Sequence, residues 1–200
     1  MARPTAARVR RRRLTLLGLV LGAALIALVV TLNPLKDAVQ EITLPLRHED
    51  IIRQQARDKD LDPALIAAVI YQESRFRDQT SHAGARGLMQ ITPDTARFIA
   101  RNSGGIRFVQ GDLATPQINI AYGSWYLRYL LQRYEGRMPL AVAAYNAGMR
   151  NVDGWVQDAG GAEDFDARAD IPFPETRHYV LNVMKRRKDY ARRYSRELGL

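Results

Sequence analysis

The chain has 200 residues, no cysteine and a formal net charge of +9, which comes from 30 Lys and Arg against 21 Asp and Glu. This length suits one domain of ordinary size, or one domain with an appendage. The lack of cysteine excludes a disulfide framework, a Cys-rich zinc site, an iron–sulfur cluster, a cysteine nucleophile and a lipid-modified cysteine.

The positive charge is concentrated near the two ends of the sequence. Residues 1–36 contain seven Lys and Arg and no acid, and residues 185–200 contain seven Lys and Arg against two acids. Residues 37–184 hold 16 Lys and Arg against 19 Asp and Glu, a net charge of −3. A nucleic-acid-binding domain concentrates basic side chains on its folded part. The charge distribution therefore argues against that class, and no nucleic-acid partner is expected.

Residues 14–32 form a run of 19 residues without a charge, which is long enough for a helix to cross a membrane. No small-residue cleavage site follows the run, and Asn33-Pro34 is a natural helix end. The arginines at 10–13 are expected to stay in the cytoplasm. We therefore expect a single-pass protein with its C-terminal part outside the cytoplasmic membrane: a basic cytoplasmic segment at 1–13, a transmembrane anchor at 14–35 and a tether at 36–46. A cleaved signal peptide and a buried core helix are the alternatives.

The rest of the sequence is typical of a series of helices. Asp62-Pro63, Thr92-Pro93 and Thr115-Pro116 each place a capping residue before a proline at the first helical position. No segment alternates apolar and polar residues as a half-buried strand does, so the expected fold class is all-α. The expected helices are 48–60, 62–74, 92–101, 115–136, 139–148 and 174–193, with a loop at 159–174, a domain spanning 47–194 and a tail at 195–200.

Glu73 is the first candidate for chemistry. On the helix that begins at Pro63, an apolar stripe is formed by Leu65, Ile66, Val69 and Ile70. Glu73 follows Val69 by four residues and Ile70 by three, so it continues the stripe toward the core. Burial would raise the pKa of its carboxyl and favour the protonated form, which a general acid requires. The alternative is a glutamate at a helix end that reaches solvent.

Three further clusters follow Glu73 in the sequence. Residues 81–91 form a Gly-rich loop that ends in Leu88-Met89-Gln90-Ile91, residues 143–148 read Ala-Ala-Tyr-Asn-Ala-Gly, and residues 171–180 form a proline-stiffened entry into a helix. Glycines let backbone approach a ligand closely, and an amide side chain offers both a donor and an acceptor. Each cluster by itself is more often structural than functional.

Four motifs that occur in a fixed order along the chain are together more specific than any one of them alone. They are Glu73-Ser74-x-Phe76; Ser81-x-x-Gly84-Ala85-x-Gly87-Leu88-Met89-Gln90-Ile91-x-Pro93-x-Thr95-Ala96; Ala143-Ala144-Tyr145-Asn146-Ala147-Gly148; and Ile171-Pro172-x-x-Glu175-Thr176-x-x-Tyr179-Val180. This series resembles the catalytic domain of the soluble lytic transglycosylases, from about Ile51 to Tyr190. The resemblance implies a lysozyme-like, mostly helical fold with a groove for the glycan strand of peptidoglycan.

The resemblance also implies a mechanism. Glu73 matches the single catalytic acid/base of the family, which cleaves the β-1,4 bond between N-acetylmuramic acid and N-acetylglucosamine and forms a 1,6-anhydro ring without consuming water. Asp78 and Asp94, the acids nearest to it in sequence, do not occupy motif positions. Glu175 and Thr176 match positions that support the groove. Substrate-binding positions are matched by Ser81, Met89, Gln90, Tyr145, Asn146 and Tyr179.

No metal or cofactor is expected. The acidic tract at 163–170 lacks the glycine of an EF-hand loop and has Arg168 at a ligand position, and the three histidines lack metal-binding spacing. The expected partners are peptidoglycan strands and the membrane, while protein partners in the cell-wall machinery stay open. The alternatives are a hydrolytic muramidase on the same fold and a catalytically silent glycan-binding module.

Overall fold

Helix α3, Pro63–Ser74, lies at the centre of the domain and is buried on all sides over most of its length. Asp62 caps it by accepting a hydrogen bond from the amide of Ala64 at 2.8 Å. Every residue from Ala64 to Tyr71 is at most 9% exposed. The apolar surface predicted as a stripe therefore extends around the whole helix from Ala64 to Tyr71, because the alanines are buried together with the branched residues.

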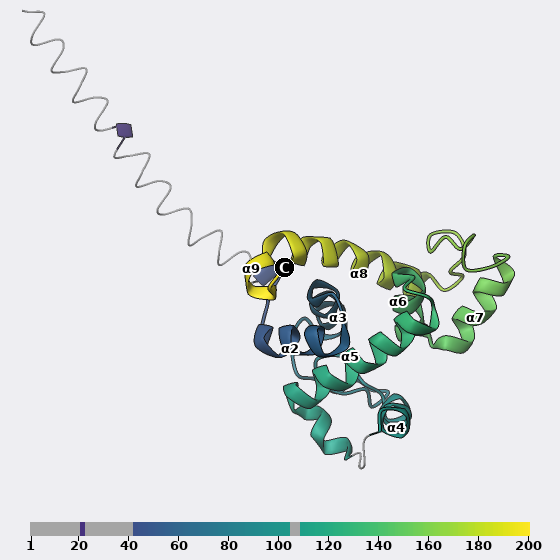
Figure 1. Ribbon diagram of the computed structural model, residues 1–200, viewed down its shortest axis with the longest axis horizontal. Coiled ribbons are helices and arrows are strands. Elements are labelled where there is room, and N and C mark those ends of the chain that lie inside the picture. Colours follow the sequence, from purple (N-terminus) through teal and green to yellow (C-terminus); the bar gives the residue numbers. More distant parts are fainter. Residues whose placement is uncertain (1–20, 23–41, 105–108) are drawn as a thin grey trace, which may run out of the picture. The chain divides into compact units, whose positions relative to one another are not determined.

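The computed structural model describes residues 21–22, 42–104 and 109–200. Most of the described helices follow one another closely, whereas long loops join α3 to α4 and α7 to α8 (Figure 1). They are α2 Glu49–Lys59, α3, α4 Pro93–Asn102, the 3₁₀ helix η1 Gln110–Ala114, α5 Pro116–Arg133, α6 Met138–Ala147, α7 Met149–Asp158, α8 Pro174–Arg193 and α9 Ser195–Leu198. Within these ranges the only β pairing consists of two isolated bridges, Thr80 with Arg86 and Arg86 with Ile91. The expected all-α class is confirmed.

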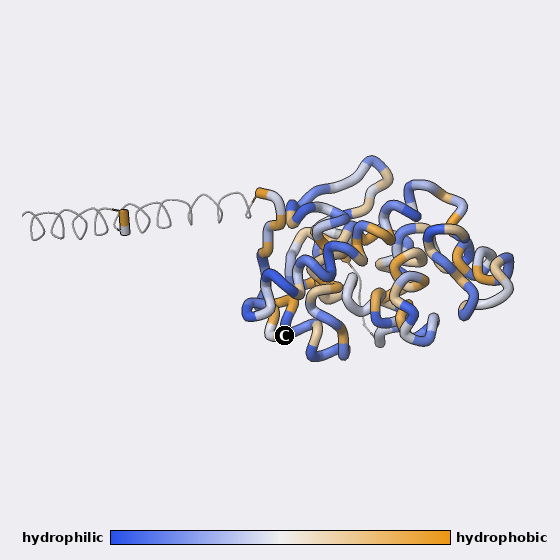
Figure 2. Tube along the Cα trace, turned by 90° about the horizontal axis from the view of Figure 1, so that it is seen from above, coloured by the Kyte–Doolittle hydropathy of each residue, from blue (hydrophilic) through white to orange (hydrophobic). Residues whose placement is uncertain are grey.

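Residues 45–200 form one compact unit that contains its own hydrophobic core, so they can fold without the residues before them. Helix α3 packs most extensively on α8, while α6 packs on both α5 and α8. Hydrophilic and hydrophobic stretches alternate along the helices in Figure 2, as expected for helices that bury one face. Tyr190 of α8 is fully buried and donates a hydrogen bond to the carbonyl of Pro45 at 2.6 Å, which attaches the first residue of the unit to α8.

The short 3₁₀ helix η1 and two α-helices were not anticipated from the sequence. Helix α7 follows α6 after a single residue, Gly148, whose φ of 84° breaks the helical path. The sequence signal for α7 is weak, since only Val152 and Trp155 are buried on it. Residues 195–200 were expected to be a tail but contain α9, where Leu198 is 1% exposed and the helix packs on α2. Burial of Leu198 and the hydrogen bond from Arg53 to the carbonyl of Glu197 both hold this segment on the domain.

The predicted transmembrane anchor at 14–35 falls outside the described residues, apart from Leu21 and Gly22. Among the helices of the described ranges, none has the length and apolar character needed to cross a bilayer.

Loss of the α3 cap should destabilise the domain. Asp62→Ala leaves the first amides of α3 without a partner and is expected to lower the free energy of unfolding by about 1–2 kcal/mol. Asp62→Asn retains the cap and removes only the ion pair with Arg187, which at a partly exposed site contributes about 1 kcal/mol or less. Urea unfolding of the two variants separates these effects. Equal losses would show that the ion pair, and not the cap, is what Asp62 contributes.

Candidate active site

A cleft of about 380 Å³ opens where α3 ends. Its walls come from the end of α3, the loop before α4, the inner faces of α4, α5 and α6, and the start of α8. The lining residues are Glu73, Ser81, Ala83, Ala85, Gln90, Ile91, Thr92, Thr95, Tyr126, Tyr145, Asn146 and Glu175. Of the six expected binding residues, Ser81, Gln90, Tyr145 and Asn146 therefore lie together with Glu73, whereas Met89 and Tyr179 do not line the cleft.

The Glu73 carboxyl is half-buried on the last turn of α3. Burial raises its pKa from 4.5 to about 7, and the hydroxyl of Tyr179 partly opposes this rise by donating a hydrogen bond to Oε1 at 2.5 Å. The position of Glu73 on the apolar helix predicts a raised pKa, and this is confirmed. Desolvation is the main cause of the raised pKa. A carboxyl with this pKa can give and take a proton near neutral pH.

Two neutral tyrosines lie near the Glu73 carboxyl, and one of them, Tyr179, donates to it. Tyr179 on α8 is 6% exposed, and Tyr145 on α6 donates a hydrogen bond to the carbonyl of Met89 at 2.9 Å. Burial first, and the nearby Glu73 charge second, raise the pKa of both phenols well above 10.0. Neither phenol therefore competes with Glu73 for a proton near neutral pH.

The loop that faces Glu73 is held mainly by a buried amide that the motif analysis missed. Asn119 on α5 is 0% exposed. Its Oδ1 accepts from the amide of Met89 at 2.8 Å, and its Nδ2 donates to the carbonyls of Arg86 at 2.9 Å and Leu113 at 3.0 Å. Gly87 has a φ of +78°, and a Cβ there would lie 2.2 Å from Asn119 Nδ2, so only glycine fits. The missed signal was a polar residue among the apolar positions of α5.

Ser74 ties the same loop to α3. Its hydroxyl lies 2.7 Å from the carbonyl of Leu88 and 3.2 Å from that of Ile70, one turn earlier in α3. The residue next to Glu73 thus fixes the loop that forms the opposite side of the cleft. The two walls are held at a set spacing by hydrogen bonds to backbone carbonyls.

Gln90 and Ser81 use part of their hydrogen-bonding capacity within the loop. Gln90 has a φ of 48°, and its Nε2 donates to the carbonyls of Gly87 at 2.8 Å and Gln79 at 3.0 Å. The hydroxyl of Ser81 accepts from the amide of Ala85 at 3.1 Å. Both side chains therefore shape the cleft wall as well as lining it. Asn146, at the end of α6, is exposed at the cleft edge.

The expected role of Met89 in the groove is wrong for its side chain. Met89 is 0% exposed, and a Cβ on Gly123 of α5 would lie 2.3 Å from its Sδ. The thioether fills the space that this glycine leaves, as methionine commonly does in cores. Met89 contributes to the site through its backbone, which hydrogen-bonds to Asn119 and Tyr145.

A second carboxylate does line the cleft, and it comes from the start of α8. Glu175 is exposed there, whereas Asp78 and Asp94 are exposed outside the cleft. Within the described ranges, no three His, Asp or Glu side chains gather closely enough to hold a metal ion.

The helical fold and the cleft define a class of domain in which one half-buried carboxyl at a helix end faces an open groove. The family model described as "Transglycosylase SLT domain" matches residues 50–167, more than half of the chain, so the chain belongs to this family.

Relatives and solved structures agree with this assignment. The chain is 37% identical over 147 residues to a soluble lytic murein transglycosylase of Salmonella typhimurium, and this match covers 72% of the chain and 23% of the relative. It is also 37% identical over 117 residues to a membrane-bound lytic murein transglycosylase F of Alcanivorax borkumensis, covering 55% of the chain and 23% of the relative. The chain thus spans about a quarter of the length of these relatives.

Two solved structures have the same fold. The 70-kDa soluble lytic transglycosylase of Escherichia coli superposes with a TM-score of 0.71 at 34% identity, covering 76% of this chain and 25% of that one. An inactive mutant of a Pseudomonas aeruginosa lytic transglycosylase, in which glutamine replaces a glutamate, gives a TM-score of 0.70 at 33% identity, with 78% and 26% covered.

The raised pKa of Glu73 predicts a pH-dependent stability. Above pH 4.5 the carboxyl ionises in the unfolded chain, while in the folded protein it stays protonated until about pH 7. The contribution of Glu73 to stability is therefore complete below pH 4.5 and is lost as the pH rises to about 7. Relative to Glu73→Gln, which does not titrate, the wild type should lose about 2 kcal/mol of unfolding free energy across this interval, allowing for water that reaches a half-buried group.

Unfolding curves of both proteins at a series of pH values measure this difference. Tyr179→Phe is the matched check, because it removes the hydrogen bond that lowers the pKa of Glu73 and should extend the loss to higher pH. A constant difference between the wild type and Glu73→Gln across this range would show that the carboxyl is well solvated.

Proposed function

We propose that this protein is a peptidoglycan lytic transglycosylase. It cleaves the β-1,4 bond between N-acetylmuramic acid and N-acetylglucosamine and leaves a 1,6-anhydro-N-acetylmuramic acid end. The observation that carries the proposal is the half-buried Glu73 carboxyl, with a pKa of about 7, at the inner end of an open cleft. The family match and the named relatives support the choice of substrate.

Glu73 performs both proton transfers. In its protonated form it donates to the glycosidic oxygen as the bond to C1 breaks, and the acetamido group of the substrate stabilises the positive sugar. As a carboxylate it then takes the proton of the muramyl 6-hydroxyl, whose oxygen attacks C1 and closes the anhydro ring. A pKa near the working pH suits a group that must act first as acid and then as base.

Tyr179 and the cleft side chains position these reactants. The 2.5 Å hydrogen bond from Tyr179 fixes Oε1 of Glu73, so the orientation of the acid is set before substrate binds. Ser81, Gln90 and Asn146 offer polar groups to sugar hydroxyls and amides. The inactive Glu-to-Gln mutant of the P. aeruginosa relative supports a mechanism that depends on one glutamate.

The presence of a second carboxylate, Glu175, in the cleft supports a second candidate function. A hydrolytic muramidase needs two carboxyl groups about 5–10 Å apart, the second acting as nucleophile or as base for a water molecule. Glu175 lines the same cleft as Glu73 and is the group that would fill this role. The two mechanisms differ in product, because hydrolysis leaves a reducing end that is heavier by one water.

Digestion of purified sacculi followed by mass spectrometry tests the reaction. The wild type should release anhydro-ended muropeptides, and Glu73→Gln should lower the rate by at least about 10²–10⁴-fold because the proton donor is lost. Glu175→Gln is the matched control and should still yield anhydro ends.

Reducing ends alone, with Glu175→Gln as inactive as Glu73→Gln, would contradict the lyase and favour the muramidase. No clearing by either the wild type or Glu73→Gln would favour a silent glycan-binding module, and equal clearing by both would show that Glu73 is not the catalytic acid.

The same proposal places the catalytic part at the outer side of the cytoplasmic membrane, held by residues 14–35. The uncharged run, the arginines before it and the membrane-bound relatives support this location. Cell fractionation should recover the full chain with membranes in high salt, and deletion of 14–32 should release it from them. Recovery of a shortened, soluble form of the full chain would indicate a cleaved signal peptide.

A further inference from the structure

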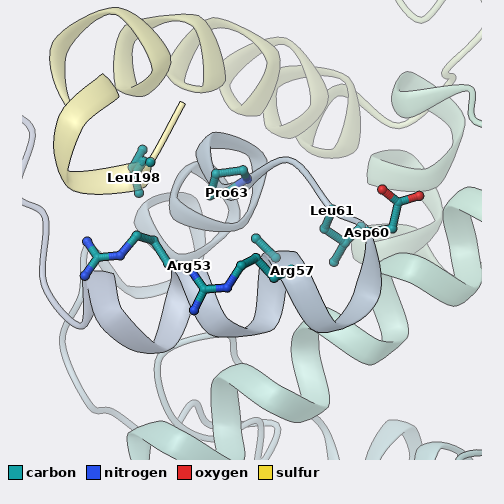
Figure 3. A pocket seen from close by; sticks show the side chains of 8 residues that line it. Arg53, Arg57, Asp60, Leu61, Pro63 and Leu198 are labelled. Atoms are coloured by element: carbon teal, nitrogen blue, oxygen red, sulfur yellow. The ribbon is translucent and has the colours of Figure 1, made fainter.

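A second pocket, of about 290 Å³, lies between α2 and α9, away from the cleft (Figure 3). Arg53 and Arg57 extend from one side of α2, one helical turn apart. The rest of the lining is mainly apolar and comprises Ala56, Leu61, Pro63, Leu198 and Gly199, together with Asp60. Two guanidinium groups beside an apolar floor suit a ligand that is both anionic and partly apolar.

The charges at this pocket are predominantly positive. Asp60 pairs with Arg128 at 3.4 Å, and Arg128 also donates to the Asp60 carbonyl at 3.0 Å. Arg53 is held by Asp50 and by the carbonyl of Glu197. Arg57 is exposed and pairs with no carboxylate in the described part of the chain. The guanidinium of Arg57 has no counter-ion and lies beside the fixed side chain of Arg53, so it attracts an anion.

The surroundings of the pocket add further positive charge. Lys188 and Arg193 on α8 and Arg196 on α9 are exposed, and within the described residues none of them pairs with a carboxylate. Helix α9 packs on both α2 and the end of α8, and Figure 1 shows it beside the start of α2. Residues 185–200, which contain the end of α8 and α9, hold seven Lys and Arg against two acids, in contrast to the net charge of −3 over residues 37–184.

The same end of the domain is where the chain arrives from the predicted anchor. Pro45 is attached to α8 by Tyr190, and α2 begins four residues later. Residues 36–44 can span at most about 30 Å when fully extended, since each residue reaches about 3.3–3.6 Å. A domain anchored as proposed above thus keeps its basic end within reach of lipid headgroups.

We propose that this pocket binds the headgroup of an anionic phospholipid, with its phosphate on Arg57 and Arg53. The apolar floor accommodates the glycerol and the first methylenes of the acyl chains. The inference rests on the membrane anchoring and not on the proposed reaction, because neither arginine lines the cleft.

Vesicle flotation of residues 45–200 tests the pocket without the anchor. The fragment should float with vesicles of phosphatidylcholine mixed with phosphatidylglycerol and not with phosphatidylcholine alone. Arg57→Gln removes one unit of charge and should weaken vesicle binding about fivefold, because each unit of charge near an anionic surface contributes a factor of about five. Arg57→Glu changes the charge by two units and should weaken binding about twentyfold. Arg150 on α7 is exposed and unpaired within the described residues, so Arg150→Gln and Arg150→Glu match these charge changes away from the pocket.

The proposal is overturned if the Arg150 variants weaken binding as much as the Arg57 variants, since net charge alone would then explain it. It is also overturned if inorganic phosphate occupies the pocket as readily as the anionic phospholipid does and so releases the fragment from the vesicles. That result would indicate a site for soluble anions. Loss of binding to purified sacculi but not to vesicles in Arg57→Glu would assign the pocket to a wall polymer. Sacculus digestion and membrane fractionation of the full-length Arg57→Gln should match the wild type, so failure here is separable from failure of the proposed function.

Discussion

The burial of α3 is the constraint on which the rest of the domain depends. A helix with no polar side from Ala64 to Tyr71 must be covered all around, and α2, α5, α6 and α8 provide this cover directly or through one another. Glu73 belongs to the last turn of the same helix, so its carboxyl is partly buried and exposed only toward the cleft. Desolvation at Glu73 costs the folded state about 2–3 kcal/mol at neutral pH. Burial of one or two of the isoleucines and leucines of α3 offsets this, at about 1.5–3 kcal/mol each.

The side of the cleft that faces Glu73 is shaped by backbone more than by side chains. Asn119 and Ser74 both hold carbonyl or amide groups of the loop, and Tyr145 holds another, so three helices determine the course of one segment. Gly87 and Asn119 fit each other so closely that a substitution at either changes both. An amide replaced by an apolar residue here would leave buried backbone groups unpaired, which costs about 1–3 kcal/mol for each group. The loop therefore presents Ser81 and Gln90 to the cleft in one conformation.

Local signals made most of the helices predictable, whereas long-range contacts did not appear in the sequence pattern. The cap-and-proline pairs at Asp62, Thr92 and Thr115 preceded helices as expected, because these signals act within four residues; the side chains of Asp62 and Thr92 cap their helices, whereas that of Thr115 makes no capping hydrogen bond. The burial of Glu73 was predictable for the same reason, since helical spacing places its side chain on the same side of α3 as the apolar stripe. Helix α9 was missed because its stability comes from Leu198 against α2, distant in sequence.

The same distinction explains the errors within the site. Met89 stands in a motif that lines a groove, yet the space left by Gly123 draws its side chain into the core, and no pattern around Met89 reveals that space. Asn119 looked like an ordinary polar residue of a long helix until its three partners, the nearest six residues away and the farthest 33, were brought to it by the fold. Glu175 enters the cleft because α8 packs on α3, a contact between segments about one hundred residues apart.

Helix α8 joins the two functional regions of the molecule in one rigid element. Tyr179, which orients the acid, lies near its first turns, and Arg193 is its last residue. Fourteen residues of α-helix separate them, a rise of about 21 Å. If the proposed lipid contact forms at the end of α8 that carries Arg193, the length of this helix limits how far Glu73 can lie from the lipid. Under the proposed function, glycan strands would then be selected by their distance from the membrane as well as by their chemistry.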